Sequence, residues 1–108
     1  MKSKITKYTK ISAISGEPAE EAHHLIWGDM GAKRKKADQD GLILPVTHDE
    51  HTGGELSKRI HDNSMAESLS KIAGQLGYEK EYYRQQVEPG SEDPARDAFL
   101  KRYGKSYL

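Results

Sequence analysis

Two short apolar segments, residues 22–27 and 42–46, restrict the first half of the chain to short strands and turns. Each has the length of a strand and stands beside glycine or proline. An earlier segment, residues 5–14, is rich in isoleucine, threonine and tyrosine with rough alternation, which is typical of extended structure. Because the Ser-Gly-Glu-Pro sequence at 15–18 is a turn signal, we expect residues 5–14 and 22–27 to pair as a hairpin. Residues 42–46 are then a further short strand.

The second half of the chain carries a helical pattern. Four apolar residues recur at helical spacing: Met65, Leu69, Ile72 and Leu76. Ser64 and Glu67 match a capping box at the start of this pattern. The sequence therefore predicts an amphipathic helix from residue 64 to about residue 86, ended by the Glu-Pro-Gly sequence at 88–90.

Glycine and proline residues lie within the predicted helices and at their ends in the second half of the chain. Gly74 and Gly77 weaken the long helix, at roughly 1 kcal/mol each, or else allow close packing against it. Asp93 and Pro94 predict the start of a last helix, because proline is favoured at the first helical position. Gly104 predicts its end.

The composition describes one small domain without net charge. Of its 108 residues, 34% are apolar and 31% charged, with 17 basic and 17 acidic side chains. Attraction to nucleic acid must therefore depend on local clusters of charge. The absence of cysteine excludes disulfides and cysteine-ligated zinc. The basic N-terminus lacks the apolar core of a secretory signal, and no apolar run has membrane-spanning length, so we expect a cytoplasmic protein.

The histidines are placed where a metal site would need them. The chain has five: His23, His24, His48, His51 and His61. The adjacent pair lies in the second predicted strand. Thr47 and Glu50 predict the start of a short helix on which His48 and His51, three residues apart, share one face. We interpret His61 as part of the start of the long helix rather than as a ligand. A hairpin and a helix that direct imidazoles to one point suit zinc and similar divalent ions.

Three short motifs give the chain a resemblance to a known family. They are Ser12-x-x-Ser15-Gly16, His23-His24-Leu25 and Val46-Thr47-x-x-Glu50-His51. Together they resemble the HNH nucleases, whose core is a β-hairpin and a helix around one divalent ion, the ββα-metal finger. The resemblance covers about residues 10–62. In zinc-braced members cysteines occupy the positions of Ser12, Ser15, Thr47 and Glu50, so the resemblance implies that the second, structural zinc is absent. The two C-terminal helices resemble, less specifically, those that follow such fingers in small phage-encoded proteins.

The resemblance implies a role for each histidine of the motifs. His23 and His51 match family metal ligands, and His48 resembles the additional helix ligand of colicin-type nucleases. His24 matches the general base that deprotonates water. One nitrogen cannot be both ligand and base, but neighbouring residues of a strand point to opposite sides, so an adjacent pair can divide the two tasks. The divalent ion acts as a Lewis acid in phosphodiester cleavage.

Two further sets of residues complete the predicted site. The family asparagine that positions the loop and the base has no match, and Asp40, or Gln39, stands nearest to its position. A polar loop carries four adjacent cations that we interpret as a patch contacting DNA phosphates: Lys33, Arg34, Lys35 and Lys36.

These expectations combine into an α+β fold and a function. We expect one domain over residues 1–108, with a ββα-metal finger followed by a C-terminal pair of helices at about 64–108. The predicted function is metal-dependent DNA endonuclease, with one divalent ion (zinc, magnesium, manganese or nickel) and DNA as partner. The alternative is a non-catalytic metal-binding finger that binds nucleic acid or a protein. Cleavage of plasmid DNA discriminates between the two.

Overall fold

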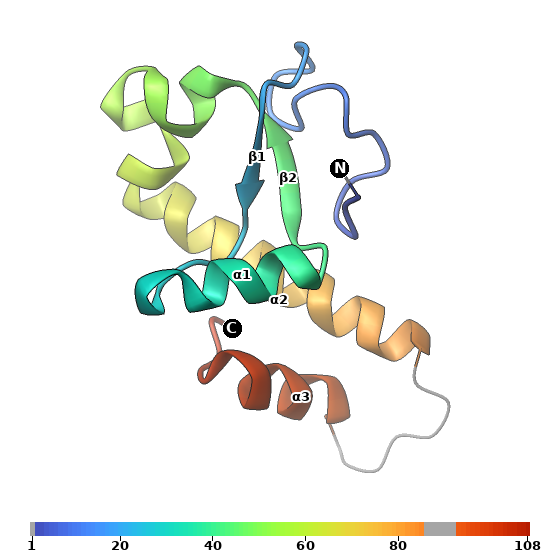
Figure 1. Cartoon of the computed structure of the whole chain (residues 1–108). Helices are drawn as coiled ribbons and strands as arrows, with labels where there is room; N and C mark the ends of the chain where they lie inside the picture. Colours follow the sequence, from blue (N-terminus) through green and yellow to red (C-terminus); the bar gives the residue numbers. More distant parts are fainter. Residues whose placement is uncertain (1, 86–92) are drawn as a thin grey trace.

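A computed structural model describes residues 2–85 and 93–108 of the chain. It has the predicted α+β class, with a two-stranded antiparallel sheet and helices packed beside and below it (Figure 1). The main elements are β1 (Glu21–His24), α1 (Ala32–Gln39), β2 (Ile43–Val46), α2 (Ser64–Gln85) and α3 (Pro94–Tyr103). Single helical turns lie at Asp49–Gly53, Leu56–Lys58 and Ile60–Asp62, between β2 and α2.

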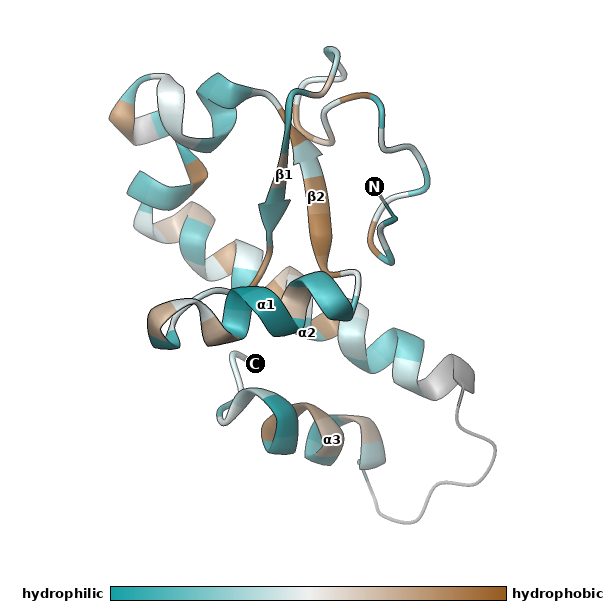
Figure 2. Ribbon diagram, viewed as in Figure 1, coloured by the Kyte–Doolittle hydropathy of each residue, from teal (hydrophilic) through white to brown (hydrophobic). Residues whose placement is uncertain are grey.

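The predicted hairpin is wrong in its pairing. Strand β1 pairs with β2, in the register Glu21 to Val46 and His24 to Ile43, and α1 lies in the connection between them. Residues 5–14 form no strand and contribute only an isolated bridge from Ile11 to Pro18. The physical reason is burial. Strand β2 is the strongly apolar segment (Figure 2), whereas the lysines and threonines of residues 5–14 leave that segment largely exposed.

The basic segment is a helix and not the loop that we expected. Residues 33–36 lie within α1, which follows Gly31 in a left-handed conformation at φ 95°. Lysine, arginine, alanine and glutamine are good helix formers, so the segment has the propensity for a helix despite its polarity. Only Ala37 of this helix is buried. The helix consequently presents most of its charges outward.

The two long helices begin where the sequence predicts. For α2 the capping residue is Asn63, whose Oδ1 accepts from the backbone N–H groups of Met65 and Ala66 at 3.0 Å each, rather than Ser64. For α3 the Asp93 side chain accepts from Arg96 N, and the left-handed residue at 104 ends the helix. The predicted end of α2 near residue 86 and the turn at 88–90 lie outside the described residues.

Helix α2 is buried on a different side from the one its apolar pattern suggests. Met65, Leu69 and Leu76 are 70%, 61% and 53% exposed. The buried positions are instead small or polar: Ser70, Gly74, Gln75 and Glu79. Glycine permits this close approach, because a Cβ at position 74 would lie 2.8 Å from Ile26 Cγ1. A Cβ at Gly77 would meet Ile5. Gly74 and Gly77 therefore allow close packing against α2, as the second of the two interpretations of the sequence expects.

We expect Gly74→Ala to destabilise the protein although alanine is the better helix former. The gain in helix propensity is about 1 kcal/mol, whereas forcing a methyl group into a packed interior costs about 1–3 kcal/mol. The urea midpoint should therefore fall. Ser68→Ala, at an exposed position of the same helix, is the matched control and should change the midpoint little. A midpoint raised by Gly74→Ala would show that the packing of α2 on Ile26 is looser than described.

The core lies between the sheet and the helices α1, α2 and α3. Its buried residues are Leu25, Ile26, Ala37, Leu42, Phe99 and Tyr103. The residues directly after β1 and directly before β2 belong to this core, so the strands are fixed at that end. No helix within the described ranges is long and apolar enough to cross a membrane.

The four positions that match family cysteines form one hydrogen-bonded cluster. Ser12 Oγ donates to Glu50 Oε1 at 2.6 Å, and Thr47 N donates to the same oxygen at 2.9 Å. The Thr47 hydroxyl accepts in turn from Glu50 N at 3.2 Å, which confirms the predicted capping box. Burial raises the pKa of Glu50, but these bonds and one from Ser15 outweigh it and lower the pKa. The cluster joins the N-terminal segment to the turn that carries two of the histidines.

Candidate metal centre

Three histidines from separate parts of the chain meet beside the sheet. His23 comes from β1, His51 from the turn after β2, and His61 from the last turn before α2. Each offers one ring nitrogen, and these three nitrogens lie within 4.8 Å of one another. The Nε2 atoms of His51 and His61 are 2.9 Å apart. Side chains far apart in the sequence thus form a group of the size that one metal ion requires.

His23 supplies the most informative observation about this cluster. Its side chain is fully buried, and its Nε2 lies 2.8 Å from Ser70 Oγ. Because the Ser70 hydroxyl donates to Leu25 O at 2.9 Å, it must accept from His23, which places the histidine proton on Nε2. Nδ1 then carries a lone pair, and it is buried without a hydrogen-bond partner among the described residues. Burial first, and the neighbouring histidines next, lower the pKa of His23 to about 3.

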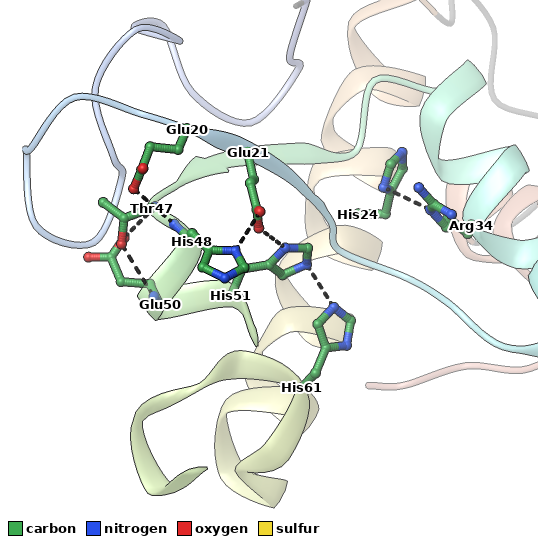
Figure 3. A network of polar contacts seen from close by, with 9 residues as sticks. All are labelled: Glu20, Glu21, His24, Arg34, Thr47, His48, Glu50, His51 and His61. Carbon is green, nitrogen blue, oxygen red and sulfur yellow. Dashed lines mark hydrogen bonds and ion pairs between the residues drawn. The ribbon is translucent and has the colours of Figure 1, made fainter. Parts of the chain in front are cut away.

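His51 is oriented by a carboxylate. Its Nδ1 lies 2.8 Å from Glu21 Oε1, so the proton on Nδ1 is donated to Glu21 and the lone pair is on Nε2, facing His61 (Figure 3). A carboxylate behind an imidazole is the usual support of a metal-binding histidine. Glu21 and His23 are two residues apart on one strand, which places both side chains toward the same side. The signal for this support in the sequence is an acidic residue two positions before His23.

His61 belongs to the cluster, so it is more than the part of a helix start that the sequence predicts. It lies in the turn Ile60–Asp62, and its Nε2 faces His51. Burial, followed by the proximity of His51, lowers the pKa of His61. His23 and His61 therefore favour the neutral form of the imidazole, which is the form that binds metals. Three nitrogen donors suit zinc and similar ions, and they leave coordination positions for water or substrate.

His48 lies outside this cluster. Its side chain is 56% exposed, and its Nδ1 contacts the second carboxylate oxygen of Glu21 at 2.7 Å. Its backbone N–H donates to Glu20 Oε1. The bond to Glu21 raises the pKa of His48, and the bonds of His48 and His51 lower the pKa of Glu21. Of the three predicted ligands, the structure brings together His23 and His51, with His61 in place of His48.

His24 points away from its neighbour and toward α1. Its Nε2 lies 3.0 Å from Asp38 Oδ1, and Arg34 Nε donates to its Nδ1 at 3.4 Å. The expected division of directions between the adjacent histidines is confirmed. His24 and Arg34 line a pocket of about 360 Å³, and two histidines of the cluster line the same pocket. The lining residues are Ala22, His24, Trp27, Arg34, His51 and His61.

Asp40 and Gln39, the candidates for positioning His24, have other partners. Asp40 Oδ2 accepts from Arg102 Nε at 2.6 Å and from the Tyr103 hydroxyl at 2.7 Å. Gln39 Oε1 accepts from Arg102 as well. Both residues join α1 to α3. The carboxylate at His24 belongs to Asp38, which stands one helical turn after Arg34, so that both side chains share a face of α1.

The four adjacent cations are divided among different surroundings. Lys33 Nζ donates to the Tyr107 hydroxyl at 3.2 Å, and Lys36 Nζ donates to Arg102 O at 2.8 Å. Lys35 is exposed, and together with Met30 it lines a different pocket. Arg34 alone of the four lines the pocket next to the histidines. Helical geometry causes this division, because consecutive residues of a helix face different directions.

Comparison with family models, curated proteins and solved structures finds no match. The resemblance to HNH nucleases therefore depends on the three motifs alone. Function has to be inferred from the chemistry of the site, which consists of three clustered imidazoles, a separate imidazole between an aspartate and an arginine, and one pocket that touches both.

Because His23 is buried and uncharged, we expect the folded protein to lose stability in acid. Between pH 6.5 and about 3 the unfolded chain binds a proton that the folded chain excludes. Stability in the presence of EDTA should therefore be complete above pH 6.5 and fall as the pH approaches 3. His61, whose pKa is also lowered, acts in the same direction. Urea midpoints at several pH values between 7 and 4 measure the effect. A midpoint independent of pH would contradict a buried neutral His23.

Proposed function

We propose that this protein is a metal-dependent DNA endonuclease with the arrangement of a ββα-metal finger. One observation carries the proposal. A single pocket is lined by two histidines of the cluster, by His24 and by Arg34. Metal donors, a proton acceptor and a cation for phosphate are the three components that hydrolysis of a phosphodiester needs.

The proposed metal donors are Nδ1 of His23 and Nε2 of His51 and His61. The chemistry of these atoms fits a borderline divalent ion, since all three are imidazole nitrogens and the buried Nδ1 has no other partner in the described chain. When bound, the ion supplies Lewis-acid stabilisation of the charge that develops on phosphate oxygens. Ser70 and Glu21 hold two of the rings in the tautomers that leave these nitrogens free.

His24 is proposed to act as general base through Nδ1. Asp38 accepts the proton on Nε2, so the lone pair is on Nδ1. As the water oxygen bonds to phosphorus, its proton passes to Nδ1 of His24. The bond from phosphorus to the 3′ oxygen breaks, and the 3′ oxygen leaves with the electron pair and takes a proton from solvent. Arg34 Nε reaches this nitrogen at a long 3.4 Å. In the proposed complex the guanidinium turns to the phosphate, for which its planar set of donors is well suited.

The order of elements supports the finger arrangement. Strand β1 carries His23 and His24, β2 returns beside it, and the helical turn after β2 carries His51. This is the order that the resemblance to HNH nucleases implies, with α1 inserted between the strands. The resemblance implies His48 as a further ligand, and in the proposed site His61, from a later turn, takes its place.

The direct test is cleavage of supercoiled plasmid DNA. Protein treated with EDTA is assayed with Mg²⁺, Mn²⁺, Ni²⁺ or Zn²⁺, and nicked product is expected with at least one of them. EDTA should abolish the activity. The control is His51→Ala, prepared by the same procedure, which excludes a contaminating nuclease if it is inactive. Metal binding without cleavage under any of these conditions would favour a non-catalytic metal-binding finger instead.

A further inference from the structure

A second pocket beside the candidate metal centre combines cations with an aromatic ring. It has about the same volume, 360 Å³, and lies between the start of α2 and the C-terminal segment. Its lining residues are Ser64, Glu67, Ser68, Lys71, Lys105 and Tyr107. Three ammonium groups surround the Tyr107 ring, with Nζ of Lys105, Lys33 and Lys71 at 5.4, 5.7 and 5.8 Å from its centre.

Two contacts connect this pocket to the one at His24. Lys71 Nζ lies 4.8 Å from the centre of the Trp27 ring, which lines the first pocket, while Lys71 itself lines the second. Lys33, which bonds the Tyr107 hydroxyl, directly precedes Arg34 on α1. The C-terminus lies close beneath α1 (Figure 1). Cations and aromatic rings therefore follow one another from His24 to Tyr107.

The charges of this surface favour a polyanion. Arg34 and Lys105 have no carboxylate partner among the described residues. Glu67 is the acidic residue that lines the second pocket, and its Oε1 pairs with Lys71 Nζ at 3.0 Å. In a chain without net charge, local clustering of this kind is what attracts nucleic acid.

We propose that the surface formed by Trp27, Arg34, Lys71, Lys105 and Tyr107 holds an unpaired DNA strand that leads from the candidate metal centre. This inference depends on the proposed function for the identity of the polymer. An unpaired strand is favoured over a duplex because its bases expose their faces, and aromatic rings bind such faces beside a cationic path for the backbone. Lys105 is exposed, so its ammonium group can move from the Tyr107 ring to a phosphate and leave the ring to a base.

Fluorescence anisotropy with a labelled oligonucleotide of about 16 nucleotides, single-stranded or in a duplex, tests this surface in the presence of EDTA. Wild type should bind the single strand more tightly. Tyr107→Leu should weaken that binding about tenfold, the value of one stacked base, whereas Tyr107→Phe should retain it. Lys105→Ala should reduce the slope of log K against log salt by about 0.7, the contribution of one phosphate contact.

The N-terminal segment offers a matched control. Lys7 Nζ lies 5.6 Å from the centre of the Tyr8 ring, which is 66% exposed, so the same pair of side chains occurs outside the proposed surface. Tyr8→Leu and Lys7→Ala should leave binding unchanged. Melting curves of all variants exclude unfolding as the cause of weaker binding.

Two outcomes would overturn the inference. One is single-strand binding by Tyr107→Leu equal to that of wild type, and the other is a duplex bound as tightly as the single strand. Plasmid cleavage by the wild type separates this failure from that of the proposed function. A protein that cleaves DNA but binds it without Tyr107 contradicts the surface alone. A protein that binds a single strand through Tyr107 but never cleaves contradicts the endonuclease alone.

Discussion

Adding Zn²⁺, Ni²⁺ or Mn²⁺ to the metal-free protein is expected to raise its melting temperature, and His61→Ala is expected to abolish that rise. The reason is that the imidazoles of His23, His51 and His61 converge only in the folded state, so metal binding stabilises that state by mass action. At a metal concentration one hundred times Kd the gain is about 2.7 kcal/mol. For a domain of this size that corresponds to a rise in Tm of about 10 °C or more.

His48→Ala is the matched control for this experiment. His48 and His51 share the same partner, Glu21, and both follow β2, but only His51 faces the cluster. We expect His48→Ala to keep the metal-induced rise in Tm and His51→Ala to lose it. If His48→Ala abolished the rise while His61→Ala preserved it, the ligand set would be that of the resemblance and not that of the structure.

The parts of the site that the sequence predicted depend on local periodicity. The opposite directions of His23 and His24 follow from strand alternation, and the capping box of Thr47 and Glu50 follows from a three-residue spacing. Both need only a correct assignment of local structure. For the same reason, both ends of α3 could be placed from Asp93, Pro94 and Gly104. The capping-box match also places the start of α2 correctly, although Asn63 and not Ser64 is its cap.

The residues that were missed depend on tertiary contacts. His61 reaches the cluster because short helical turns fold the segment after β2 back onto His51, and no periodicity indicates that path. Ser70 supports His23 from 47 residues away. The apolar stripe of α2 predicted the helix but not its buried side, since Gly74 lets the small face pack more closely than the larger residues could.

The contact of Asp38 with His24 lies between these two cases. Once residues 32–39 are known to be helical, Arg34 and Asp38 must share a face. A loop at residues 33–36 implies no such relation, and in the sequence Asp40 stands nearest to the position of the family asparagine. Asp40 instead joins α1 to α3 through Arg102 and Tyr103. Helix α3 thus fixes the C-terminal end of α1, and α1 also carries Arg34 and Asp38, which contact the candidate base His24.

His24→Ala is expected to separate catalysis from metal binding. Because His24 contacts Asp38 and Arg34 and no histidine of the cluster, the variant should keep the metal-induced rise in Tm. Plasmid cleavage should fall by roughly 10²- to 10⁴-fold, the usual contribution of a positioned general base. His23→Ala should differ from its neighbour by losing the metal-induced rise together with activity.

Asp38→Asn tests the orientation of the candidate base. An amide can still contact His24 Nε2, but it lacks the charge that favours protonation of the imidazole during proton transfer. We therefore expect Asp38→Asn to cleave plasmid DNA more slowly than wild type at neutral pH, because its His24 is the weaker base, while the metal-induced rise in Tm is unchanged. A cleavage rate equal to that of wild type would remove Asp38 from this role. Full cleavage activity in His24→Ala would exclude His24 as the base.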